Sequence, residues 1–198
     1  PSPYHLDRIV TFLEDDGVVA IPTDTIYALA CLPDRKAAVA KLMALRRLDA
    51  RKPLALVFRD VAHISEFTLV DNQAFRVLRR YLPGPYTFVL EARRGLPRYI
   101  GDRRKRIGVR IPEHKIPVSL VDAVGKPLIV TSAVDPDTQL HLTDPWSVEN
   151  VFGHGLSATV DCGDSHFGLS TVIDLTESPP TLLRQGLGDA GEFDSQVE

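Results

Sequence analysis

The stretch Gly17-Val-Val-Ala-Ile-Pro-Thr-Asp-Thr-Ile-Tyr-Ala-Leu-Ala30 decides the fold. Val18 to Ile21 is a short apolar run rich in β-branched residues, which predicts a buried strand, and Pro22 ends it because proline cannot donate the next ladder hydrogen bond. The polar turn Thr23-Asp24-Thr25 follows, just past a strand end, where open α/β sheets usually bind ligands. The alternative is an ordinary capped turn that leads into a helix, and these residues alone leave both interpretations open.

Helix and strand patterns alternate outward from this stretch. Helical spacing predicts a helix over 4–16, and Asp34 is expected to cap a second helix that runs to Leu48. Further helices are expected at 60–67, 72–82, 117–124 and 144–152, and further strands at 54–58, 86–91, 109–111, 128–132, 158–161, 170–175 and 181–184. This pattern predicts an α/β fold, a single domain over 1–193 built on an open, twisted, mostly mixed sheet with flanking helices. The glycine-rich segment after Arg184 is expected to be flexible, with 194–198 as a flexible tail.

Composition narrows the class of protein. A chain of 198 residues with 44% hydrophobic content can bury one core. Its sequence contains neither the roughly 18 consecutive apolar residues of a membrane helix nor a signal-peptide pattern. Cys31 and Cys162 are too few for a disulfide framework, so reduced thiols and a cytoplasmic location are expected. The six histidines lack ligand spacing, and no metal site is expected.

The charges are unevenly distributed along the chain. Residues 46–115 hold 17 of the 23 Lys and Arg but only 7 of the 26 acidic residues, so this segment carries +10 and the remainder −13. Such a division favours an anionic partner, either the phosphates of a nucleotide or those of a nucleic acid. The alternative is a solvated surface whose two halves neutralise each other in the folded protein.

Common nucleotide and hydrolase motifs are absent from the sequence or lack their context. There is no P-loop pattern, and the Gly-x-Gly at 153–155 follows a helix instead of a strand, so it is interpreted as a turn. Ser132 and Ser170 lack a recognisable activating base and are interpreted as hydrogen-bonding groups.

What remains is a set of hydroxyls and arginines at strand ends. An arginine presents a planar fork that matches carboxylates and phosphates, and neighbouring hydroxyls can complete an anion pocket. The alternative is that each is a surface or capping residue. The set comprises Thr23, Thr25, Arg106, Arg110, Thr131, Ser132, Ser170, Thr171 and Arg184.

The chain resembles the YrdC-like threonylcarbamoyl-AMP synthase family over nearly its whole length. The segments that carry the resemblance are 21–29, 53–54, 81–87, 108–112, 131–132, 170–174 and 184–186. Segments 67–72, 104–110 and 185–189 look more similar still to the YciO branch of that family.

The resemblance implies an open α/β fold with a large basic concave face. It also implies a nucleotidyltransferase-type reaction that forms threonylcarbamoyl-AMP from L-threonine, bicarbonate and ATP with Mg²⁺, linked to tRNA modification, and double-stranded RNA binding. By position, Thr25, Arg110 and Ser170 would face the threonine, and Lys52, Arg106, Ser132 and Arg184 would face ATP, with Arg46 at the position of a triphosphate-binding lysine. The basic run Arg103, Arg104 and Lys105 would serve RNA.

The chain departs from the synthase pattern at three places. The synthases' Lys-x-Arg is Arg46 and Leu48 here, a histidine of the next strand is Val57, and the Ser-x-Asn motif ends in Val134. Two hypotheses follow. The first is a YciO-type enzyme that binds ATP and L-threonine with weak or altered synthase activity. The second is a non-catalytic protein that binds double-stranded RNA or a nucleotide on the same face.

Overall fold

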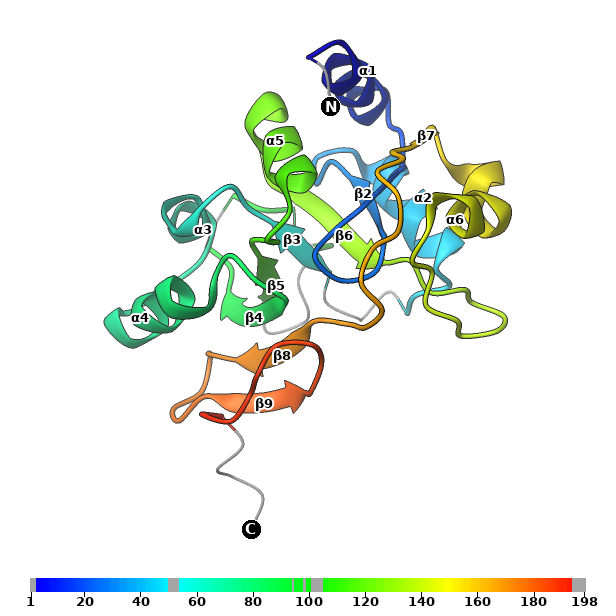
Figure 1. The fold of residues 1–198 in the computed structure, drawn as a ribbon. Coiled ribbons are helices and arrows are strands. Elements are labelled where there is room, and N and C mark those ends of the chain that lie inside the picture. The colour runs from blue at the N-terminus through cyan, green and yellow to red at the C-terminus, as the bar shows by residue number, and fades with distance from the viewer. Residues whose placement is uncertain (1–2, 50–53, 94, 98, 101–104, 194–198) are drawn as a thin grey trace.

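The computed structural model describes residues 3–49, 54–93, 95–97, 99–100 and 105–193. In this part of the chain the strands form one mixed sheet of order β7-β1-β2-β6-β3-β5-β4-β8-β9 with flanking helices (Figure 1). The predicted α/β class and mixed sheet are confirmed. The strands are β1 Val19–Ile21, β2 Ala28–Cys31, β3 Ala55–Val57, β4 Tyr86–Glu91, β5 Arg106–Arg110, β6 Leu128–Ser132, β7 Ala158–Thr159, β8 Thr171–Asp174 and β9 Thr181–Arg184. The helices are α1 Pro3–Glu14, α2 Lys36–Leu45, α3 Val61–Phe67, α4 Asn72–Tyr81, α5 Lys115–Val124 and α6 Pro145–Phe152, with a 3₁₀ turn at Gly153–Gly155.

The opening stretch forms two strands instead of a strand that leads into a helix. β1 pairs antiparallel with β2, with Val19 opposite Ala30, and the loop between them carries Thr23-Asp24-Thr25. β2 then pairs antiparallel with the central strand β6. The polar turn is therefore fixed on both sides by buried strands.

Helices pack against both faces of the sheet. α2, α3, α4 and α6 contribute to a core cluster that includes Leu29, Phe58 and Val109. α1 and α5 pack with Ile21 and Leu128 in a second cluster on the opposite face. Because side chains alternate along a strand, each buried strand supplies residues to both clusters.

The second face continues beyond α1 and α5 as a strip of small and polar residues. Ala55 and Gly108 are register partners on β3 and β5, and Thr87 of β4 lies beside them. A Cβ built on Gly108 would lie 2.9 Å from the Thr87 methyl and 3.3 Å from the Ala55 Cβ. Only small residues fit here, so the sheet itself forms the floor of an open cavity.

Capping residues begin three of the described helices and end a fourth. Asp60, Asp71 and Asp144 each accept a hydrogen bond from a backbone N–H of the first turn of α3, α4 and α6. Gly125 ends α5 in the left-handed conformation, as its sequence position indicates.

Two expectations are wrong. Asp34 does not cap α2, which begins after Arg35 and ends at Leu45, because its carboxylate accepts a 2.6 Å bond from Lys126 Nζ instead. The glycine-rich segment after Arg184 is packed against the domain, since Gly188 lies on the Tyr86 ring and Phe193 is buried. The predicted tail, 194–198, lies outside the described residues.

Two smaller findings complete the fold. Cys31 is buried, Cys162 is exposed, and both are free thiols. Among the described helices, none is long and apolar enough to cross a membrane.

Candidate functional site

The open part of the sheet forms a cavity of about 590 Å³. Its floor comes from β2, β3, β4, β5 and β6, and its rim from residues that follow β6 and from β8 and β9. Three arginines lie in the lining, and no Asp or Glu lies among the described residues that line it. A cavity with this balance of charge favours an anionic ligand. The polar lining residues are Arg46, Thr87, Arg110, Thr131, Ser132, Gln139, His141, Ser170 and Arg184.

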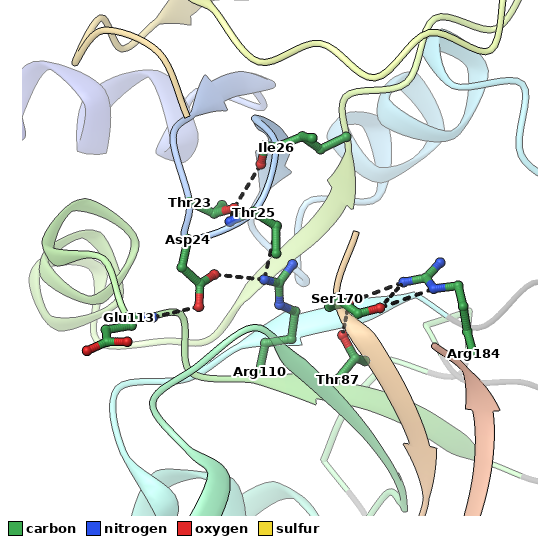
Figure 2. A network of polar contacts seen from close by, with 9 residues as sticks. All are labelled: Thr23, Asp24, Thr25, Ile26, Thr87, Arg110, Glu113, Ser170 and Arg184. Carbon is green, nitrogen blue, oxygen red and sulfur yellow. Dashed lines mark hydrogen bonds and ion pairs between the residues drawn. The ribbon is translucent and has the colours of Figure 1, made fainter. Parts of the chain in front are cut away.

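Arg110, at the end of β5, is joined to the loop between β1 and β2. Its Nη2 donates to Asp24 Oδ1 at 2.9 Å and to Thr25 Oγ1 at 3.3 Å (Figure 2). The other Asp24 oxygen accepts from the Glu113 backbone N–H at 2.9 Å. Thr23 Oγ1 lies 2.9 Å from Thr25 Oγ1 and donates to the Ile26 carbonyl, so the loop is held in one shape.

The Arg110 guanidinium is buried but not fully satisfied. The residue is only 4% exposed, and in the described structure its Nε has no hydrogen-bond partner. Burial lowers the pKa of Arg110 from its ordinary value, while the Asp24 carboxylate opposes that shift. An arginine stays protonated under such a shift, so this group can still bind a carboxylate or phosphate in the cavity.

Ser170 lies just before β8 and connects the floor of the cavity to the edge hairpin. Its hydroxyl lies 2.8 Å from Thr87 Oγ1. Arg184 on β9 donates to the Ser170 carbonyl from Nε at 3.1 Å and from Nη2 at 2.8 Å, and Nη2 also reaches the Ser170 hydroxyl at 3.2 Å (Figure 2). Ser170 therefore sits between a hydroxyl of the floor and a cation of the rim.

Another wall of the cavity contains two of the three departures from the synthase pattern. Arg46 donates from Nη1 to the carbonyl of Val134, and both residues line the cavity beside Leu48. Burial lowers the pKa of Arg46, and the nearby Asp135 carboxylate opposes that shift. Two sequence departures 86 residues apart thus lie on one wall, and the arginine is turned onto a backbone carbonyl.

The third departure, Val57, lies elsewhere. It is fully buried on β3, among apolar residues of the cluster under α5. Val57 is the register partner of Arg110.

The structure brings together eight of the sequence-predicted site residues. Six of them line the cavity, namely Arg46, Arg110, Thr131, Ser132, Ser170 and Arg184, while Thr25 is bonded to Arg110 and Thr23 to Thr25. Thr171 is buried outside the lining, where its hydroxyl donates to the Gly188 carbonyl. The remaining predicted positions stand apart or cannot be placed. Arg106 begins β5 and pairs with Asp174 at 3.2 Å, outside the described cavity lining. Lys105 precedes β5 with φ of +61°, and Lys52, Arg103 and Arg104 lie outside the described residues.

Sequence reasoning missed Asp24 and Thr87, which bond to predicted site residues, and also Gln139 and His141 of the cavity lining. Asp24 was noted only as part of a polar turn, and its pairing with Arg110 spans 86 residues. Thr87 follows the Pro83-Gly84-Pro85 turn in a strand pattern, and nothing in that pattern indicates which face its hydroxyl takes.

The fold and the site together define the class of protein, which is an α/β domain with an arginine-lined cavity beside the Thr23–Thr25 loop. Comparison with known sequences gives the family. Residues 11–186 match the Sua5/YciO/YrdC family model, described as telomere recombination, and the chain belongs to this family.

The chain is similar to YciO of Escherichia coli, an uncharacterised protein, with 32% identity over 98% of this chain and 94% of that protein. The crystal structure of that YciO superposes with a TM-score of 0.93. The threonylcarbamoyl-AMP synthase of Pyrococcus abyssi is 30% identical over 88% of this chain and 52% of its own length. The crystal structure of P. abyssi Sua5 in complex with L-threonine is 28% identical and superposes with a TM-score of 0.86, over 92% of this chain and 54% of that one.

Proposed function

We propose that this protein is a YciO-type member of its family that binds ATP and L-threonine in the arginine-lined cavity and forms threonylcarbamoyl-AMP slowly, from bicarbonate, L-threonine and ATP. The observation that carries the proposal is the buried Arg110 fork, held by Asp24 and Thr25 at the edge of a cavity whose described lining contains no carboxylate. A threonine carboxylate and nucleotide phosphates are both ligands for such a site. In this proposal the protein is linked to tRNA modification through its product, threonylcarbamoyl-AMP.

The residues divide into two groups by position. Arg110, Thr25 and Ser170 would hold the amino acid, with the guanidinium on its carboxylate and the hydroxyls as hydrogen-bonding partners. Arg46, Ser132 and Arg184, which line the cavity, would face the nucleotide. Lys52 and Arg106 keep this role only as what the resemblance implies, since Arg106 pairs with Asp174 outside the lining and Lys52 lies outside the described residues. These groups would orient the reactants, because proximity and fixed charge are what an adenylate-forming site supplies.

Mg²⁺ would enter with the nucleotide. Among the described residues, no group of three or more His, Cys, Asp and Glu side chains could hold a metal ion. Mg²⁺ is usually bound through substrate phosphates with few protein ligands, so the cavity fits a magnesium–nucleotide better than a free ion.

Weak turnover is expected from the wall formed by Arg46, Leu48 and Val134. Leu48 can donate no hydrogen bond, and the Arg46 guanidinium already donates to the Val134 carbonyl. Removal of one cationic or donor group aimed at developing charge commonly costs about a hundredfold in rate. ATP binding should therefore survive better than catalysis.

The test measures ATP binding by calorimetry and pyrophosphate release from ATP, with and without L-threonine and bicarbonate. We expect measurable ATP binding and slow pyrophosphate release that requires both L-threonine and bicarbonate. Arg110→Lys keeps a charge opposite Asp24 but removes the fork, so it should abolish threonine-dependent pyrophosphate release while ATP still binds.

The matched control is Arg79→Gln, an arginine exposed on α4. This variant should have the same ATP affinity and the same rate of pyrophosphate release as the unmodified protein. ATP binding too weak to measure, or pyrophosphate release that ignores L-threonine, would reject the proposal.

A further inference from the structure

The mouth of the cavity carries an exposed aromatic ring that the proposed reaction does not use. Phe167 is 75% exposed, although most phenylalanines in folded proteins are buried. Its ring centroid lies 5.5 Å from that of His141, at an interplanar angle of 41°. His141 lines the cavity, so the Phe167 ring stands at its entrance.

Other apolar side chains extend this surface. Leu183 lines the cavity and is 55% exposed, and Leu187 is 45% exposed. Leu187 packs directly on Gly168, the residue after Phe167, where an added Cβ would lie 2.6 Å from Leu187 Cδ2. The mouth, defined here as His141, Phe167, Leu183 and Leu187, is thus an apolar rim on a cationic cavity.

The backbone fixes Phe167 at this place. Gly168 has φ of +147° and Gly163 has φ of +78°, conformations that other residues rarely adopt, so the segment turns sharply on either side of the ring. Ser165 donates from its backbone N–H and its hydroxyl to the Thr143 carbonyl, at 2.7 and 3.0 Å. The Gly168 carbonyl accepts from the Ile26 N–H at 3.3 Å, which ties the segment to the Thr23–Thr25 loop.

We propose that Phe167 forms a stacking site for the base of the nucleotide whose phosphates bind the cavity arginines. A nucleotide has an anionic end and a flat apolar end, and the site offers a cationic interior and an aromatic mouth in the same order. The Phe167 and His141 rings already contact each other, so the base stacks on the open side of Phe167, with His141 as support. This inference rests on the proposed nucleotide binding.

The experiment compares ATP with inorganic tripolyphosphate, which has the charge of the triphosphate and no base. Phe167→Ala should weaken ATP binding by about tenfold and leave tripolyphosphate binding unchanged, because loss of an aromatic–base stack costs about fivefold to 150-fold in affinity in comparable sites. Phe167→Tyr should bind ATP as the unmodified protein does. Trp146→Ala is the matched control, since Trp146 is 73% exposed on α6 outside the cavity lining, and it should change neither affinity.

A spectroscopic readout makes the test independent of affinity. Trp146 is the chain's one tryptophan, so Phe167→Trp combined with Trp146→Phe leaves a single indole at the mouth. ATP should quench its fluorescence, and tripolyphosphate should not.

Three outcomes overturn the inference. The first is equal ATP affinity in Phe167→Ala and the unmodified protein, which would leave the proposed function intact. The second is equal loss of ATP and tripolyphosphate binding in Phe167→Ala. The third is a loss of duplex RNA binding in that variant with ATP binding unchanged, which would assign the mouth to RNA. If the unmodified protein binds no ATP at all, the proposed function fails as well.

Discussion

One wall of the cavity, formed by Arg46, Leu48 and Val134, determines how many cationic donors face a ligand. The Arg46 guanidinium donates to the Val134 carbonyl, and Leu48 places an aliphatic side chain beside them. A cation bonded to a backbone carbonyl is held in place and has fewer donors for a ligand. The positive charge is present on this wall, but the contact with Val134 determines where the Arg46 guanidinium points.

At this scale we predict that Arg46→Lys together with Leu48→Arg raises the rate of threonine-dependent pyrophosphate release by about tenfold or more. The lysine shortens the group that reaches Val134, and the new arginine adds donors to the cavity wall. The measurement is a steady-state pyrophosphate assay beside a known synthase. Leu69→Arg adds the same charge on an exposed site outside the cavity and should leave the rate unchanged. An unmodified protein that already matches the synthase would show that these positions are dispensable.

Most site residues could be predicted individually, but their contacts could not. Thr25, Arg110 and Ser170 were placed by the resemblance, and the cavity brings them within one site. The Asp24 contact was not predictable, because an ion pair across 86 residues depends on how β1, β2 and β5 are ordered in the sheet. The spacing of residues along the chain does not reveal the order of the strands in the sheet.

At the scale of single elements, the N-cap residue Asp144 holds the start of α6 with two hydrogen bonds. Asp144 accepts from the Ser147 backbone N–H at 2.8 Å and from the Ser147 hydroxyl at 2.6 Å. These hydrogen bonds lower the pKa of Asp144. By contrast, α2 begins after Arg35 with no side-chain cap, since Asp34 is bonded to Lys126.

We predict that Asp144→Ala lowers the free energy of unfolding by about 1 kcal/mol, the usual value of an N-cap. Urea unfolding at neutral pH is the measurement. Asp7→Ala, an exposed acidic residue within α1, is the control and should change the free energy by less than about 0.5 kcal/mol. Equal values for the two variants would show that the Asp144 cap adds no stability.

The elements themselves were predictable to different degrees. β4 was predicted at its observed bounds because Tyr86–Glu91 alternates clearly, with turn residues before it. β2 was missed, since Ala28–Cys31 contains small residues and no β-branched one, and small residues favour no strand on their own. It becomes a strand because β1 and β6 pair with it on both sides.

At the scale of the whole molecule, the buried His63 and the half-buried His114 make stability depend on pH. Burial lowers the pKa of His63, which lies between the Phe58 and Phe67 rings, and of His114, whose Nδ1 caps α5. The unfolded chain binds protons at these groups near the ordinary value of 6.5, before the folded protein does. The stability is therefore complete above pH 6.5 and is lost as pH falls through the lower folded values.

We predict that the urea midpoint decreases as the pH is lowered from about 8 to about 5. His63→Leu combined with His114→Asn should flatten this dependence, because the asparagine side-chain oxygen replaces Nδ1 as the capping acceptor and neither new residue titrates. His154→Asn, at an exposed histidine, should retain the slope of the unmodified protein. A slope that persists in the double variant would assign the effect to other groups.

The uneven charge leads to a second prediction at this scale. If residues 46–115 contact phosphates, affinity for double-stranded RNA should fall steeply with added salt and depend little on sequence, because bound cations release counterions. Arg103, Arg104 and Lys105 changed together to Gln should weaken binding and reduce the salt slope. The control changes three exposed cations of α1 and α2 to Gln, namely Arg8, Lys36 and Lys41. Undetectable binding at low salt, or equal losses in both triple variants, would reject this role for the basic run.

The strand order also determines when the cavity can exist during synthesis. Its walls come from positions as distant as Ala28 and Arg184, and the edge hairpin β8–β9 supplies the last of them. A nascent chain that has not yet released β9 from the ribosome therefore lacks a wall. A ligand of the cavity can therefore bind only after β9 has been made, and its binding cannot guide the earlier steps of folding.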